Sequence, residues 1–405
     1  MTLVRIVGMT KEQSFFLQVL SDHLNGRQTN PQENIDWSVI MTLTQNHQVN
    51  GIVYWQCKDF LPDELGKRLR NKYFSELYFY YNREALFKQV KQAFSAAQIP
   101  FYTVKGLAVA QYYPIPALRT MGDCDIVVHT EDKEKANSVL ISLGYENQSK
   151  AAKEWVYYKN NLEFELHDHL LYDEFGSSKS SRMFTDASAW KETVNTTDGT
   201  RYELNWSFHF AFLLLHLKKH IIHYGVGFRQ FMDLAVVLQH CDLDWAWLRE
   251  TMIELELLDF ALVCLALLRR WFGIVCPVES KVLDEAFYEV STEQIIKNGV
   301  FGFDNKTNSK NAAINTIIWR CGPLWWVRVK VLLRSAFPTY QDMRYVPYYS
   351  FVNRRPWLLP AAWIYRFFRS VRYRMTRNGK ALLDKAMTDE GTLNARTELL
   401  AKWGL

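Results

Sequence analysis

The first hundred residues repeat apolar side chains at the spacing of a helix. In the segment KEQSFFLQVLSDHL, which starts at residue 11, apolar positions recur every three or four residues and so share one helical face. Asp36 can cap a second helix. Pro62, followed by two acids, starts a third helix that runs to about residue 98 without a breaker. These patterns predict an N-terminal helical module over residues 1–98.

Beyond residue 99 the pattern becomes that of short strands. FYTVK, from residue 101, and DCDIVV, from residue 123, are runs of β-branched and aromatic residues with a helical segment between them. EWVYYK and LEFELHDH meet at Asn160–Asn161, which predicts a hairpin, and WKETV and RYELN predict another around Asp198–Gly199. This order of elements predicts a small α/β or α+β domain over residues 99–205.

Helical spacing returns over residues 206–405, and the last part of this region, from about residue 305, is rich in aromatic and basic residues. Between Asn305 and Lys380 there are fifteen Lys and Arg residues and one acid, Asp342, although the net charge of the chain is only +5. This excess indicates an anionic partner, and the interleaved arginines and aromatics of residues 319–377 fit RNA or a membrane surface. Alternatively, the aromatics form a core and the arginines line its surface.

Composition excludes several classes of protein. The chain has 405 residues, 48% hydrophobic and 22% charged, which is enough to bury sizeable cores in two or three domains. No apolar run approaches the roughly 20 residues of a membrane span, and the start lacks the apolar region of a secretory signal. The six cysteines are scattered without a CxxC pair, which excludes a disulfide framework and a cysteine-ligated zinc module. We therefore expect a cytoplasmic protein.

Acidic side chains cluster on two of the predicted strands. Asp123 and Asp125 are two positions apart, so both carboxylates project from one face of a strand, and Glu163, Glu165 and His167 share a face of another. Carboxylates gathered in this way suit Mg²⁺, which completes its shell with water and substrate phosphates. Each pair alone also fits a solvated strand end.

A turn upstream of these strands adds a feature of phosphate sites. Lys105–Gly106 lies where a strand turns into a helix, and glycine permits close approach of a ligand to backbone N–H groups. Arg119 fits either a phosphate contact or a salt bridge that holds its loop. Together with the carboxylates, these residues indicate phosphoryl or nucleotidyl transfer.

These motifs resemble the nucleotidyltransferase superfamily of the DNA polymerase β type, and more closely the bacterial "uncharacterised nucleotidyltransferase" family. The resemblance rests on KG, LRTMGDCDIVV, LGYE and FELH, and it extends to an H-x-x-x-H helix, the run from Phe228 to Asp233 and the segment from Phe337 to Arg344. It covers about residues 60–370. Two departures are Val104 in place of leucine and Leu107 in place of the serine or glycine usual after Gly106.

The resemblance implies an α+β fold, a small mixed-sheet nucleotidyltransferase domain embedded between helical modules. It implies catalytic and metal-binding roles for Asp123, Asp125 and Glu165. It also leads us to expect Lys105, Gly106, Arg119 and His167 at the nucleotide. The implied reaction is attack of an acceptor hydroxyl on the α-phosphate of an NTP, aided by two Mg²⁺ or Mn²⁺ ions. The acceptor is unknown.

Other interpretations of the sequence stay open. His216, His220 and His223 share one helical face, which fits a zinc site or contact with nucleotide or acceptor. His167 and His169 with Asp123 fit a metallohydrolase. The chain as a whole also fits a catalytically silent nucleotide-binding regulatory or antitoxin-like protein, or a module that acts through its basic C-terminal part.

Overall fold

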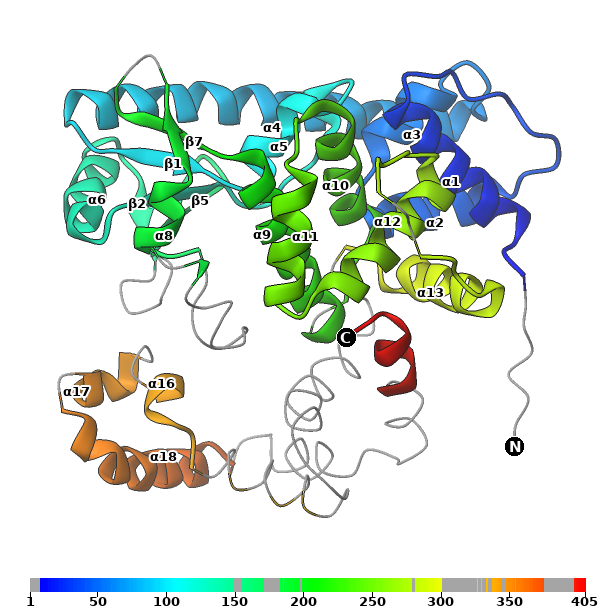
Figure 1. The fold of residues 1–405 in the computed structure, drawn as a ribbon. Coiled ribbons are helices and arrows are strands. Elements are labelled where there is room, and N and C mark those ends of the chain that lie inside the picture. The colour runs from blue at the N-terminus through cyan, green and yellow to red at the C-terminus, as the bar shows by residue number, and fades with distance from the viewer. Residues whose placement is uncertain are drawn as a thin grey trace.

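The computed structural model describes most of the chain up to residue 300 and shorter stretches after it. The described ranges are 8–148, 155–170, 183–184, 186–196, 199–223, 225–278, 281–300, 337–343, 347–353, 355–374 and 397–405, with residues 326, 329 and 333. Four helices precede the sheet (Figure 1): α1 (Lys11–Leu24), α2 (Trp37–His47), α3 (Asn50–Cys57) and α4 (Asp63–Ala96).

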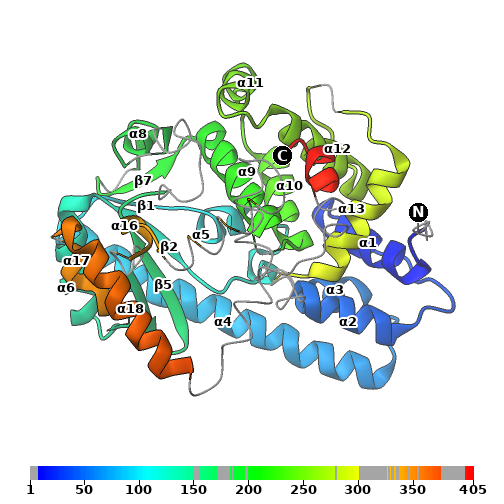
Figure 2. The same cartoon turned by 90° about the horizontal axis from the view of Figure 1, so that it is seen from below.

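Local sequence explains how these helices begin. Thr10 caps α1 in a reciprocal arrangement with Gln13, and the Asp36 carboxylate accepts the backbone N–H of Ser38 at the start of α2. The third predicted helix begins one residue after Pro62 and is the long α4. In both ribbon views α4 runs along the N-terminal helices and the sheet, so it connects the two (Figures 1 and 2).

The described strands form one mixed sheet in the order β3-β4-β5-β2-β1-β7-β6. The strands are β1 (Phe101–Thr103), β2 (Asp125–Val128), β3 (Glu146–Asn147), β4 (Trp155–Lys159), β5 (Leu162–His167), β6 (Thr193–Asn195) and β7 (Arg201–Leu204). Two pairs, β2 with β5 and β1 with β7, are parallel, and the others are antiparallel. Between the strands lie α5 (Gly106–Val109), α6 (Lys133–Ser142), α8 (Asp186–Lys191) and short 3₁₀ turns at Ala110–Tyr112, Pro116–Leu118 and Thr130–Asp132.

The two faces of the sheet bury apolar side chains in different cores. Ile126 and Val128 of β2 pack with Phe164 of β5 and with side chains of α4 and α6. Val127 and Tyr102 face the other way, into the core of the N-terminal helices and the helices after the sheet. Because side chains alternate along a strand, Asp125 and Glu165 lie on this second face, away from α4 and α6.

Helices after the sheet cover that second face. They are α9 (Trp206–His223), α10 (Phe228–His240), α11 (Trp245–Glu254), α12 (Leu258–Phe272) and α13 (Glu285–Asn298). Near the C-terminus lie α16 (Tyr340–Met343), α17 (Ser350–Asn353) and α18 (Leu359–Arg374), with 3₁₀ turns at Pro347–Tyr349 and Pro356–Leu358. No helix in the described part of the chain is long and apolar enough to cross a membrane.

The predicted α+β fold with a mixed sheet is confirmed, and so are both hairpins. Asn160 and Asn161 both have positive φ, the geometry that a two-residue hairpin turn requires. Two details differ from the prediction. The strand expected from Asp123 begins at Asp125, and Trp190 and Lys191, expected in a strand, end helix α8.

Candidate functional site

The acidic residues of β2 and β5 meet because these neighbouring strands are parallel and in register. Asp125 lies opposite Glu165, and Val127 lies opposite His167. One ligand atom from each of Asp125, Glu165 and His167 lies within 4.8 Å of the others. Two carboxylates and an imidazole at this spacing can hold a divalent cation.

Asp125 is buried and bonded to two cationic side chains. Lys105 Nζ lies 2.6 Å from Asp125 Oδ1, and His167 Nε2 lies 3.0 Å from the same oxygen. Burial alone would raise the pKa of Asp125, but the Lys105 ammonium and the His167 hydrogen bond hold it well below its usual range. Burial alone would lower the pKa of His167, but its hydrogen bonds to Asp125 and Glu165 raise it to about 9. Asp125 is therefore a carboxylate at neutral pH.

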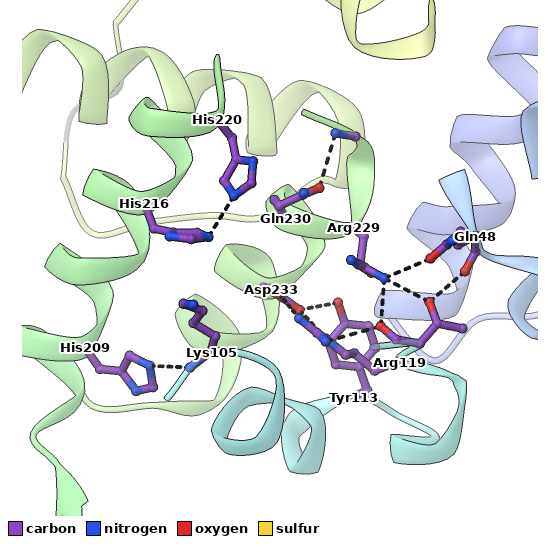
Figure 3. Close-up of polar contacts among 12 residues, drawn as sticks. Gln48, Lys105, Tyr113, Arg119, His209, His216, His220, Arg229, Gln230 and Asp233 are labelled. Atoms are coloured by element: carbon purple, nitrogen blue, oxygen red, sulfur yellow. Dashed lines mark hydrogen bonds and ion pairs between the residues drawn. The ribbon is translucent and has the colours of Figure 1, made fainter. Parts of the chain in front are cut away.

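Lys105 adopts an unusual backbone conformation to reach this position. Its φ of 52° and ψ of −125° are rare for a residue with a side chain. The Lys105 N–H donates to His209 Nε2 at 3.1 Å, and burial lowers the pKa of His209 to about 4, so this imidazole stays neutral and can accept (Figure 3). His209 on α9 thus fixes the turn that carries Lys105.

A cavity of about 350 Å³ opens beside these strands. On the side of the sheet it is lined by Asp123, Glu163, Gly106 and Lys105. Neither Asp123 nor Glu163 forms an ion pair with a described residue. Burial raises the pKa of Glu163, and the nearby Glu165 carboxylate adds to this rise against a hydrogen bond from Tyr158. The sheet therefore presents unneutralised carboxylates to the cavity.

Gly106 lies at the predicted turn, but Arg119 occupies the space where a side chain would be. A Cβ at Gly106 would come within 2.5 Å of Arg119 Nη1. Arg119 in turn binds Asp233 of α10 through two hydrogen bonds, Nη2 to Oδ2 at 2.6 Å and Nε to Oδ1 at 3.1 Å. The sequence allowed two interpretations of Arg119. The salt bridge is present, and the contact with phosphate stays a prediction.

The helical wall of the cavity contains two features that the sequence left unassigned. Arg229, on the first turn of α10, reaches Thr120 O at 3.0 Å and Gln48 Oε1 at 3.3 Å (Figure 3). His216 and His220 of α9 also line the cavity, and their Nε2 atoms lie 2.9 Å apart. Burial lowers the pKa of His216 well below its ordinary value, so this ring is neutral at physiological pH.

The structure brings together most of the residues expected at the site. Asp123, Lys105, Gly106 and Arg119 line the cavity, and Asp125, Glu165 and His167 form the cluster behind it. The roles assigned to these residues stay predictions.

The geometry adds no support for the two other histidine sites, the metallohydrolase site with His169 and the zinc site on α9. His169 Nδ1 lies 3.3 Å from Asp168 Oδ1, and among the described residues no third ligand joins His216 and His220. The side chain of His223 and the residue Arg344 lie outside the described part of the chain.

Sequence reasoning underrated Glu163 and missed Arg229. The shared face of Glu163 and Glu165 was visible in the alternation of β5, and it also fitted a solvated strand edge. Arg229 had no local signal, because its neighbours Gln48 and Thr120 are about a hundred or more residues away in sequence.

Comparison with known proteins identifies a family. The family described as "Uncharacterised nucleotidyltransferase" matches residues 33–273, more than half of the chain. No curated protein matches. The chain is similar to the solution structure of the antibiotic-resistance factor ANT(2'')-Ia, with 10% sequence identity and a TM-score of 0.32. The aligned part covers 42% of this chain and 89% of that protein. That similarity is too low to support a conclusion about the site.

Membership of the wider DNA polymerase β type superfamily stays a prediction. The family match, with the mixed sheet and the acidic cluster, assigns the protein to the enzymes that transfer phosphorus-containing groups. The chain belongs to the uncharacterised nucleotidyltransferase family.

Proposed function

We propose that the protein transfers a nucleoside monophosphate from an NTP to a hydroxyl group of an acceptor, with divalent metal held by Asp123, Asp125 and Glu165. The observation that carries the proposal is the parallel register of β2 and β5, which places Asp125 opposite Glu165 beside a cavity that Asp123 lines. Carboxylate oxygens on adjacent strands are suitable ligands for Mg²⁺ or Mn²⁺.

The proposed reaction exchanges one phosphorus–oxygen bond for another. The acceptor oxygen attacks the α-phosphorus of the NTP, the bond from that phosphorus to the pyrophosphate oxygen breaks, and the acceptor proton passes to a carboxylate at the cavity. When bound, a divalent cation would neutralise phosphate charge and make the acceptor hydroxyl a stronger nucleophile.

Residues around the carboxylates prepare this arrangement. Lys105 and His167 bond the same oxygen of Asp125 and so fix the orientation of its carboxyl group. Lys105 also lines the cavity, where its ammonium lies near any phosphate that enters. The apolar side chains Leu213 and Leu217 of α9 line another part of the cavity.

Calorimetric titration of Mg-ATP and the other Mg-NTPs tests the proposal. The proteins to compare are wild type, Asp125→Asn, Asp123→Asn and, as a control at an exposed position, Glu131→Gln. We expect metal-dependent binding in wild type and the control that is lost in both aspartate variants. We also expect pyrophosphate release when fractions of a cell lysate supply the acceptor. Metal-dependent NTP binding without turnover in any fraction would favour the silent regulatory protein. Metal-dependent binding that survives in both folded aspartate variants would contradict the proposed site.

A second candidate function, attachment to an anionic membrane surface, is favoured by one observation near the C-terminus. Trp357, Ile364, Phe367 and Phe368, on and next to α18, are each at least 60% exposed. Ile364, Phe367 and Phe368 share one face of the helix, and Arg366 and Arg369 lie on another. We propose that this face enters the headgroup region of a bilayer while arginines meet its negative charge, as in interfacial helices.

Sedimentation with vesicles tests this second candidate. We expect wild-type protein to sediment with phosphatidylglycerol-containing vesicles more than with pure phosphatidylcholine. Phe367→Ser with Phe368→Ser should abolish this difference, while Val282→Ser, which changes an exposed apolar residue elsewhere, should not. Equal sedimentation of all variants, RNA binding in place of vesicle binding, or dimers that disappear in the double variant would each contradict membrane attachment.

A further inference from the structure

The cavity between the sheet and α10 has two ends of opposite charge. Asp123 and Glu163 form the acidic end, and neither forms an ion pair with a described residue. Arg119, Asp233 and Arg229 lie at the other end, where two guanidinium groups meet one carboxylate. Two positive charges at that end therefore share one carboxylate.

Hydrogen bonds identify which arginine lacks a carboxylate. Asp233 Oδ1 accepts from Tyr113 Oη at 2.7 Å and from Arg119 Nε, while Oδ2 accepts from Arg119 Nη2 (Figure 3). Both oxygens of Asp233 are thus committed to residues that precede β2. Asp233 lies one turn from Arg229 on the same helix, yet Arg229 forms no ion pair with it or with another described residue.

Within the part of the chain that the structure describes, Arg229 forms hydrogen bonds to uncharged groups. Its Nη1 donates to Thr120 O, Thr120 Oγ1 and Gln48 Oε1, and its buried Nε has no hydrogen-bond partner. Burial lowers the pKa of Arg229 to about 10, and the neighbouring Arg119 guanidinium adds to the fall. The side chain still carries its charge at neutral pH, and a charge with so few partners is costly unless a ligand completes its bonds.

We propose that Arg229 forms an oxyanion subsite that binds a phosphate or carboxylate group of a substrate in this cavity. A guanidinium offers paired N–H donors that match the oxygens of either group. The subsite lies at the start of α10, where the first backbone N–H groups of a helix also favour negative charge. The proposal rests on the proposed function for its substrates, and it adds the residue of the helical wall that receives their negative charge.

The phosphate or carboxylate group that binds Arg229 can belong to the polyphosphate of the NTP or to an anionic acceptor. A metal-bound triphosphate combines cations, which fit the acidic end, with oxyanions that fit Arg229. An acceptor that carries a phosphate or carboxylate would place that group at Arg229 and its hydroxyl nearer the sheet. The two sources predict different losses of binding in one set of titrations.

Calorimetry with Mg-tripolyphosphate, inorganic phosphate, acetate and adenosine tests the subsite. The variants are Arg229→Gln, which removes the charge, Arg229→Lys, which keeps it, and Arg249→Gln, which removes an exposed arginine of α11. We expect Arg229→Gln to weaken anion binding by roughly 10- to 100-fold, the effect of one charge-assisted hydrogen bond, and Arg229→Lys to weaken it less. Adenosine binding should stay unchanged in all variants, and so should every affinity in Arg249→Gln.

The probes separate the two sources. Loss of Mg-tripolyphosphate binding assigns the subsite to the nucleotide, whereas loss of phosphate or acetate binding with Mg-tripolyphosphate unaffected assigns it to the acceptor. Affinities unchanged within twofold for every anion in a folded Arg229→Gln would overturn the proposal, and so would equal weakening in Arg249→Gln. If Arg229→Gln does not fold, Arg229→Lys decides, since a subsite requires at least a threefold loss for one anion.

Failure of the proposed function gives a different result. Asp123→Asn would then leave metal-dependent NTP binding intact, whatever the outcome at Arg229.

Discussion

Two ion pairs lie at one cavity, and the difference between them shows how its two ends are used. Lys105–Asp125 and Arg119–Asp233 both have N–O distances of 2.6 Å. Around the first pair lie further carboxylates, so the sheet end keeps excess negative charge. Around the second lie Tyr113, which helps to saturate Asp233, and Arg229, so the helix end keeps excess positive charge.

The two pairs also differ in what they hold together. Lys105 and Asp125 belong to the sheet region, twenty residues apart, and the pair sets the orientation of a side chain. Arg119 and Asp233 are 114 residues apart and fasten the loop before β2 to α10. We therefore expect changes at the acidic end to affect binding and changes at the Arg119–Asp233 pair to affect stability.

The largest expected effect is at the acidic end. Asp123→Asn should weaken metal-dependent NTP binding by more than about a hundredfold, because even an outer-shell partner of a metal site contributes up to about that much. The melting temperature in metal-free buffer should stay close to that of wild type, since Asp123 forms no ion pair with a described residue. Calorimetry and thermal unfolding check both statements. A large fall in melting temperature would show that this end is structural.

At the Arg119–Asp233 pair the expected loss is in stability. Asp233→Asn should lower the free energy of unfolding by about 3–5 kcal/mol, because it leaves Arg119 buried without a counter-charge. Urea unfolding measures this loss. A change below about 1 kcal/mol, the scale of an exposed pair, would mean that this pair does not fasten α10 to the loop.

A third carboxyl group, Glu76 on α4, shows how burial changes a pKa when no described cation is at contact distance. It accepts the Gly51 N–H at 2.9 Å and an Asn50 N–H at 3.3 Å, and burial raises its pKa to about 7. Folding therefore favours its protonated form. The stability from this group is fully present below about pH 4.5 and is lost as the pH rises to about 7. The difference between wild type and Glu76→Gln should change by about 1–3 kcal/mol across this range. Unfolding curves at pH 5 and pH 8 measure it, and a difference independent of pH would contradict the assignment.

The smallest expected effect is at Leu107. Its side chain packs against the core beneath the sheet and does not line the cavity, so Leu107→Ser should change NTP affinity by less than about twofold. Stability should fall by about 1 kcal/mol from lost apolar contact. A marked change in affinity, measured by the same titration, would place residue 107 at the nucleotide.

Local patterns predicted the strands and the acidic residues, because period-two alternation and a pair of asparagines act over a few residues. Asp125, Glu165 and His167 meet because β2 and β5 are parallel and in register, and the alternation of each strand already showed which of its residues share a face. The pairing of Arg119 with Asp233 and the position of Arg229 could not be predicted, since they depend on how α10 packs against the loop before β2. A single sequence contains no signal for such distant contacts.

The central claim is that the carboxylates of β2 and β5 hold divalent metal beside an NTP. Anomalous diffraction from crystals grown with Mn²⁺ and a non-hydrolysable NTP analogue tests it most directly. The account predicts anomalous peaks in contact with Asp125 and Glu165, with Asp123 as a further ligand and the analogue's phosphates adjacent. Nucleotide density with no peak at these residues, or a peak at His216 and His220 instead, would contradict it.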